Sequence, residues 1–199
     1  MKLVGLTGGI ATGKSTVARL IAERGIPIVD ADQLAREAVE PGQPALAEIA
    51  RLWPQAFIAH DGRLDRKRLG AIVFADPAAR RRLEAILHPR ISELCAARAA
   101  ALAAAGHKLA FYEASLLVET GRHRDFDGLV VVTASPETQI ERAMARDHLT
   151  REQARARIDA QLPMADKVAV ATHVIDNSGD PAATAAQVER LLTELGWEP

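Results

Sequence analysis

The sequence has little cysteine, because Cys95 is the single one among its 199 residues. One cysteine excludes a disulfide network or a cysteine-based metal site within the chain, and its alanine-rich surroundings predict a small, buried, apolar residue. Long apolar runs are lacking too, since no stretch approaches the roughly 20 residues that span a bilayer. The N-terminal apolar run is too short for a signal peptide. We therefore expect a cytoplasmic protein without a membrane partner.

An excess of charge of one sign is also lacking, because 25 Lys and Arg residues offset 26 Asp and Glu residues, for a formal net charge of −1. No overall basic field therefore argues for a nucleic-acid partner, and a polyanionic substrate would need local clusters of Arg and Lys. The 48% hydrophobic content is ordinary for a globular protein. The chain is long enough for one core with an insertion or two.

Short apolar segments alternate with helical patterns along the chain, which predicts an α/β fold with a parallel sheet covered by helices on both faces. The five expected strands are 3–6, 26–29, 109–112, 129–133 and 173–176. The helices expected around them are 14–24, 88–106, 136–147, 150–161 and a last one through Val188 and Leu195. His88-Pro89 is expected to open the second of these, because proline is favoured in a first turn. Residues 33–87 have helical patterns broken by prolines, and we interpret them as a mainly helical insertion that recognises a substrate.

Residues 8–15 read Gly-Gly-Ile-Ala-Thr-Gly-Lys-Ser, which fits the phosphate-binding pattern Gly-x-x-x-x-Gly-Lys-Ser between a strand and an amphipathic helix. Glycines let successive backbone N–H groups turn toward phosphate oxygens, and the helix start adds its positive dipole end. Lys14 would reach the β- and γ-phosphates, and the Ser15 hydroxyl would bind Mg²⁺. The expected ATP-binding residues of this loop are Gly8, Gly9, Ala11, Thr12, Gly13, Lys14, Ser15 and Thr16.

The loop by itself does not distinguish a kinase from a nucleotide switch or a motor. A guanine-reading Asn-Lys-x-Asp is absent, and the chain is short for a motor core. Residues 125–128 fit a loose Asp-x-x-Gly, but they precede an expected strand, so we interpret them as a turn. An ATP-dependent small-molecule kinase is the interpretation that remains.

Asp30 and Asp32 follow the second expected strand, and the carboxyl ends of strands in open α/β sheets face the ligand crevice. A carboxylate there can orient or deprotonate an attacking hydroxyl and help hold Mg²⁺ through water. The alternative is that they cap the next helix. For Asp30 capping and function are equally good interpretations, whereas for Asp32 we favour function.

Arginines gather in the segment after the fourth expected strand. Arg142 and Arg146 are four residues apart and share a helix face, and a planar guanidinium suits phosphate contacts and developing charge. Three more follow, at Arg151, Arg155 and Arg157. The alternative, expected for most of the five, is a solvated surface with Glu141, Glu152 and Asp159 as partners.

Further segments complete a pattern that spans nearly the whole chain. They are Thr7 with the phosphate loop, Val29-Asp30-Ala31-Asp32, Ala35-Arg36, Val39-Glu40-Pro41-Gly42, His88-Pro89-Arg90-Ile91, Leu116-Leu117-Val118-Glu119, 135–139, Arg142, Arg146-Asp147, Gln161 and 175–179. In order and spacing they resemble the dephospho-CoA kinase family. The resemblance implies transfer of the ATP γ-phosphoryl group to the ribose 3′-hydroxyl of dephospho-CoA, giving coenzyme A and ADP, with Mg²⁺ as cofactor.

The resemblance also implies a three-layer P-loop nucleotide-kinase fold in three parts. Residues 1–32, 88–141 and 168–199 would form the nucleotide-binding core, 33–87 a helical CoA-binding insertion, and 142–167 a mobile lid. By motif position, Asp32 would be the base or orienting carboxylate, with Lys14 and Arg142 stabilising charge on the transferred group. Asn177 would lie near the adenine of ATP. The acceptor side would be lined by Thr7, Asp32, His88, Leu116 and Arg146, although a histidine before a proline can also be a cap or a packed ring.

The sequence departs from the family pattern at a few positions. Ala11 stands where glycine is usual, Ser115 where proline is usual, and Glu113 where aspartate is frequent; Thr133 and Thr172-His173 differ at strand ends. These departures bear on the acceptor wall rather than on the reaction. Two alternatives stay open: another P-loop small-molecule kinase, for a nucleoside monophosphate or a sugar acid, or a regulatory nucleotide switch.

Overall fold

The structure is a computed structural model that describes residues 1–58 and 62–197. The chain divides into two compact units. The first combines Met1–Val29 with Leu102–Pro199, and the second is Asp30–Ala101. In the part of the chain described, no helix is long and apolar enough to cross a membrane.

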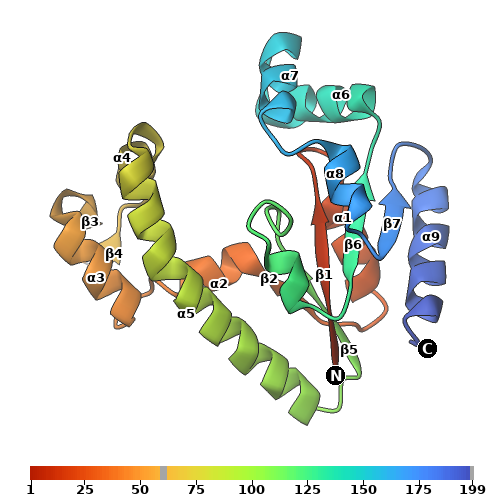
Figure 1. The fold of residues 1–199 in the computed structure, drawn as a ribbon, viewed down its shortest axis with the longest axis horizontal. Coiled ribbons are helices and arrows are strands. Elements are labelled where there is room, and N and C mark those ends of the chain that lie inside the picture. The colour runs from red at the N-terminus through yellow and green to blue at the C-terminus, as the bar shows by residue number, and fades with distance from the viewer. Residues whose placement is uncertain (59–61, 198–199) are drawn as a thin grey trace. The chain divides into compact units, whose positions relative to one another are not determined.

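A five-stranded sheet organises the first unit (Figure 1). Its strands are β1 (Lys2–Gly8), β2 (Ile28–Asp30), β5 (Leu109–Glu113), β6 (Leu129–Thr133) and β7 (His173–Asp176), in the order β2-β5-β1-β6-β7. Parallel pairing joins β1 to β5 and β6, and β6 to β7, with Leu6 opposite both Glu113 and Val130. The predicted α/β class and parallel sheet are confirmed. Because β1 lies in the centre, its carboxyl end has a neighbouring strand end on each side.

Alternation along the strands explains how the sheet is buried, because successive side chains point to opposite faces. Val4, Leu6 and Val130 enter one core with α1 (Lys14–Ala22) and α9 (Pro181–Glu194). Figure 1 shows α9 beside α1 and β7. Residues at the alternating positions, whose side chains point to the other face of the sheet, are buried as well; Tyr112 and Val131 are examples. Both faces are therefore covered, as near-continuous apolar strands predict.

Between β6 and β7 the first unit carries three helices, α6 (Pro136–Asp147), α7 (Arg151–Asp159) and α8 (Met164–Ala169). The Ser135 side chain caps α6. Thr150 and Gln153 form a full capping box at the start of α7, as the sequence predicts. A short 3₁₀ helix at Arg122–Asp125 is followed by bends at Phe126 and Asp127, within the turn expected at 125–128 before β6.

The second unit has its own core. It contains α2 (Ala31–Glu37), α3 (Pro44–Leu52), a 3₁₀ turn (Pro54–Ala56), β3 (Phe57–Ile58), β4 (Arg63–Leu64), α4 (Arg66–Ala75) and α5 (Pro77–Ala104). Leu46, Ile49, Trp53, Leu69 and Ile86 are buried together. The strands β3 and β4 form a separate antiparallel pair, so the expectation that 33–87 adds no strand to the core sheet holds for its described residues.

One helix boundary was predicted wrongly. His88-Pro89 does not open a helix, because α5 runs from Pro77 to Ala104 with Pro89 inside it. An internal proline removes one backbone hydrogen bond and costs about 3 kcal/mol. Ile86 and Ile91, buried on either side of it, offset that cost by packing. The cap interpretation of His88 is therefore wrong as well, and its side chain is exposed in mid-helix.

Candidate active site

The phosphate loop lies between β1 and α1, where the motif predicts it. β1 ends at Gly8 and α1 begins at Lys14. Gly13 is the N-cap residue of α1 in a left-handed conformation, with φ 86° and ψ 27°. Its carbonyl accepts hydrogen bonds from the amides of Thr16 and Val17, which turns the chain into the helix. The start of α1 therefore points its unpaired amides and positive dipole end at this loop.

Two of the loop glycines leave no room for a side chain. A Cβ on Gly8 would lie 2.7 Å from both the Val132 carbonyl oxygen and Thr12 Oγ1. A Cβ on Gly13 would lie 1.9 Å from Asn177 Nδ2. Ala11, where glycine is usual in the family, is left-handed at φ 58°. An L-residue there costs roughly 1–2 kcal/mol, so the loop tolerates this alanine at the expense of backbone strain.

Asn177 braces the loop from the end of β7. Its Nδ2 donates to the Thr12 carbonyl oxygen at 2.8 Å, and its Oδ1 accepts from Thr184 Oγ1 at 2.9 Å. Arg142 Nη1, from α6, donates to the same Thr12 carbonyl at 3.5 Å. Both side chains therefore lie at the phosphate loop. The Asn177 amide is engaged with the protein itself, and its nearness to adenine stays a prediction.

Lys14 forms an ion pair that the sequence did not indicate. Its Nζ lies 2.5 Å from Glu113 Oε1, and both side chains are mostly buried. Glu113 is the last residue of β5, directly beside β1. A carboxylate ending an apolar strand next to the phosphate loop is the arrangement by which P-loop enzymes hold Mg²⁺. The run Leu109-Ala110-Phe111-Tyr112-Glu113 carried that signal, but Glu113 was noted only as a departure from the family pattern.

Ser15 and Glu113 offer hard oxygen donors, which suit Mg²⁺. In residues 1–58 and 62–197 no group of three or more His, Cys, Asp or Glu side chains forms a metal cage. Magnesium in phosphoryl-transfer sites is usually held by one or two protein oxygens plus substrate phosphates and waters, so this sparse donor set fits.

Thr7 and the turn after β5 come together next to the loop. Thr7 is fully buried, and its Oγ1 donates to the Ser115 carbonyl oxygen at 3.2 Å. Leu117 is buried, whereas the neighbouring Leu116 is 53% exposed. The structure therefore presents Leu116 as an apolar surface held by an anchored backbone, which suits the acceptor-side role predicted for it.

Arg146 pairs with its neighbour Asp147, and its predicted place on the acceptor side stays a prediction. Its guanidinium binds both carboxylate oxygens of Asp147, at 2.8 and 2.9 Å. This pairing raises the pKa of Arg146, and it holds the pKa of Asp147 below its ordinary value. The remaining arginines pair as Arg151 with Glu137, Arg155 with Asp159 and Arg157 with Asp147. Most of the five are thus solvated ion pairs, as expected, although Glu137 and Asp147 replace the expected partners Glu141 and Glu152.

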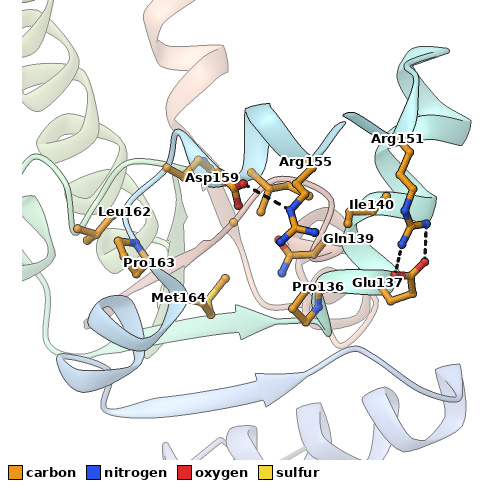
Figure 2. Close-up of a pocket in the computed structure, with 13 residues that line it drawn as sticks. Pro136, Glu137, Gln139, Ile140, Arg151, Arg155, Asp159, Leu162, Pro163 and Met164 are labelled. Atoms are coloured by element: carbon orange, nitrogen blue, oxygen red, sulfur yellow. Dashed lines mark hydrogen bonds and ion pairs between the residues drawn. The ribbon is translucent and has the colours of Figure 1, made fainter. Parts of the chain in front are cut away.

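A cavity of about 470 Å³ opens between α6, α7 and the segment 161–164, and Gly9 of the phosphate loop lines it too. Figure 2 shows its charged side chains already joined in the Arg151–Glu137 and Arg155–Asp159 pairs. Ile140, Leu162 and Met164 supply apolar walls. The sequence did not predict this space, because the residues that line it come from four separate segments.

Asp30, Asp32 and His88 belong to the second unit. Asp30 caps α2, where its carboxylate accepts from the amides of Asp32 at 2.7 Å and Gln33 at 3.3 Å. The capping interpretation of Asp30 is therefore confirmed. Asp32 gives only its backbone amide to this cap, and its side chain is exposed in the first turn of α2.

The parallel sheet, the strand–loop–helix phosphate site and the Lys14–Glu113 pair define a P-loop phosphotransferase. Comparison with known proteins then gives the family. The profile of the dephospho-CoA kinase family matches residues 2–183, and the chain belongs to this family.

A dephospho-CoA kinase of Anaeromyxobacter dehalogenans is 55% identical over 195 residues, covering 98% of this chain and 92% of that protein. A solved structure from Thermus thermophilus has a TM-score of 0.83 at 38% identity, covering 98% of this chain and 97% of the other. The structure of a dephospho-CoA kinase from Campylobacter jejuni has a TM-score of 0.75 at 26% identity, covering 97% and 96%. The similarity therefore extends over the sheet, the phosphate loop and the insertion alike.

Proposed function

We propose that this protein transfers the γ-phosphoryl group of ATP to the ribose 3′-hydroxyl of dephospho-CoA, giving coenzyme A and ADP in the cytoplasm. The observation that carries the proposal is the P-loop with its Lys14–Glu113 pair, in a chain of the dephospho-CoA kinase family. ATP and dephospho-CoA are its small-molecule partners.

Lys14 and Glu113 have complementary tasks in this reaction. The Lys14 ammonium offers three donors, and phosphate oxygens compete with the carboxylate for them. Glu113 and Ser15 would hold Mg²⁺ through their side-chain oxygens once Lys14 turns to the phosphates. When bound there, Mg²⁺ would supply positive charge to offset the charge that develops on the phosphates. The loop amides and Arg142 stabilise the transferred group.

The acceptor hydroxyl needs to lose its proton as its oxygen bonds to the γ-phosphorus and the bond to the ADP oxygen breaks. We assign that proton to the Asp32 carboxylate, which is exposed and not used as the cap of α2. General-base help of this kind contributes about 10²–10⁴-fold to a rate.

The acceptor is tested by ADP release with dephospho-CoA, AMP, CMP, gluconate or no acceptor, with the product identified by mass spectrometry. We expect stimulation by dephospho-CoA and a product phosphorylated on the ribose. Stimulation by another of these acceptors instead would point to the nucleoside monophosphate or sugar-acid alternative. ADP release that no acceptor changes would favour a nucleotide switch.

The role of Asp32 is tested by Asp32→Asn, with Asp30→Asn as the matched control. Asp32→Asn is expected to lower kcat about 10²–10⁴-fold with little change in ATP affinity. Asp30→Asn keeps a good helix cap, because asparagine caps as well as aspartate, and is expected to leave kcat nearly unchanged. Equal losses of turnover and ATP affinity in Asp32→Asn would make this residue structural or metal-binding.

A further inference from the structure

A buried charge pair in the first unit lies outside the roles described so far. Lys167, on α8, has a side chain with 0% exposure. Its Nζ forms an ion pair and short hydrogen bond with Glu119 Oε1, and the Glu119 side chain is 21% exposed. A lysine ammonium is expensive to bury unless a carboxylate pairs with it. Such a pair is weak evidence for stability, so its position needs a separate reason.

Glu119 lies in the turn after β5 that carries Leu116. That turn is fixed at its start by the Thr7–Ser115 hydrogen bond and in its middle by Leu117, which packs near Gly5. Backbone bonds close it, from the Thr120 amide to the Leu116 carbonyl and from the Gly121 amide to the Val118 carbonyl, both at 3.0 Å. Glu119, near the end of this turn, forms the ion pair with Lys167 of α8.

The partner of Glu119 belongs to a segment that is itself docked on the phosphate loop. Gln161 Oε1 accepts a hydrogen bond from the Ile10 amide at 2.6 Å. Met164, at the start of α8, packs so closely on Gly9 that a Cβ there would lie 2.9 Å from its Cε. The segment 161–167 therefore contacts the phosphate loop at one end and the Leu116 turn at the other.

We propose that Glu119 and Lys167 are positioning residues, which hold the Leu116 turn at a fixed place relative to the phosphate loop through α8. The inference rests on the proposed function in taking this turn as the acceptor-side wall. Loss of the pair is expected to weaken dephospho-CoA binding while ATP binding and the chemical step are retained, since neither side chain contacts the loop itself.

The test compares Lys167→Met, Glu119→Gln and the double variant. Glu119→Gln leaves the ammonium buried without a carboxylate and is expected to lower Tm by about 5–10 °C. Lys167→Met lowers Tm less, because the partly exposed Glu119 can turn toward water. The double variant buries no charge, and its Tm is expected to return close to that of the wild type.

In the double variant, dephospho-CoA binding is not expected to recover together with Tm. In Lys167→Met and in the double variant we expect KM for dephospho-CoA to stay about 5–10-fold raised, with kcat and KM for ATP within about twofold. Hydrogen exchange gives a readout that needs no activity: the amides of Thr120 and Gly121 should exchange faster in both variants. Arg24→Met removes a surface pair between the segment after α1 and Glu189 of α9, and it should change none of these quantities.

Recovery of KM and exchange together with Tm in the double variant would make the pair merely structural and overturn the proposal. An unchanged KM and unchanged exchange in Lys167→Met would overturn it as well. Failure of the wild type to use dephospho-CoA would instead count against the proposed function. The exchange data would still report whether the pair holds the turn.

Discussion

At the scale of single residues, the phosphate loop is held in shape by side chains from distant parts of the first unit. Asn177 and Arg142 bind the Thr12 carbonyl, and Gln161 binds the Ile10 amide. A loop held in this way loses less conformational entropy when it binds phosphates. These partners are more than 100 residues away along the chain, so local sequence patterns predict the loop but not what braces it.

Ala11 gives a prediction at this scale, because its left-handed φ of 58° strains an alanine. Ala11→Gly should relieve about 1–2 kcal/mol of strain and lose about 0.5–1 kcal/mol to chain entropy. We therefore expect Tm to rise by about 1–4 °C, measured by calorimetry, with KM for ATP within about twofold.

The control for this prediction is the same change at Ala97, which is exposed inside α5. In a right-handed helix the alanine is not strained, so Ala97→Gly should lower Tm rather than raise it. A fall in Tm for both variants would show that the Ala11 conformation carries no relievable strain.

At the scale of elements, hydrophobic periodicity predicted the helix and strand boundaries wherever the local sequence pattern and the tertiary packing agree. Strand β7 and helix α6 have the predicted boundaries, because strong caps or apolar runs mark them. α5 shows the limit of this reasoning. Its internal Pro89 is locally typical of a helix start, yet the helix continues through it, with Ile86 and Ile91 buried on either side.

The contact between α6 and α7 yields a prediction for pH. Glu137 of α6 accepts two hydrogen bonds from Arg151 of α7, at 2.8 and 2.5 Å, and this hydrogen bonding lowers the pKa of Glu137. Because the pKa is lowered in the folded state, the pair contributes its full stabilisation at pH values above the ordinary pKa of glutamate. That stabilisation is lost as the pH falls through the lowered pKa.

Carboxyl ¹³C NMR titration measures this directly. In the wild type Glu137 should titrate below the usual glutamate range, and Arg151→Met should return it to that range. Arg155→Met is the matched control, because Arg155 pairs with Asp159 and not with Glu137. A Glu137 titration that Arg151→Met leaves unchanged would mean that the ion pair does not persist in solution.

At the scale of the whole molecule, the chain forms two units with separate cores. The alternation of strands and helices predicted the sheet of the first unit. The proline-broken stretch predicted a helical insertion, but not that it would have a core of its own. The division of the chain into a core at 1–32, 88–141 and 168–199, an insertion at 33–87 and a lid at 142–167 stays a prediction, because it concerns functional parts that move and bind. Composition and periodicity predict which residues are buried. Burial by itself does not indicate which segment moves when a ligand binds.

Ligand binding offers a test at this scale, because a ligand that binds only the folded state stabilises the whole cooperative unit. At 100 times its Kd, a non-hydrolysable ATP analogue with Mg²⁺ adds about 2.7 kcal/mol of unfolding free energy. For a chain of this size we expect Tm to rise by about 5–10 °C in scanning calorimetry. Lys14→Met should remove most of that rise, since Lys14 is the proposed charged contact of the loop to the phosphates.

Two controls make the result specific to the loop. Lys2→Met removes an exposed lysine whose Nζ donates to the Leu195 carbonyl, and the rise should persist there. Glu113→Gln should keep the rise seen without Mg²⁺ but lose the increment that Mg²⁺ adds, because its carboxylate is the proposed metal ligand beside Ser15. An increment that survives in Glu113→Gln would assign the metal to Ser15 and the phosphates alone. The Lys14–Glu113 pair would then serve to hold the lysine in place rather than to bind the ion.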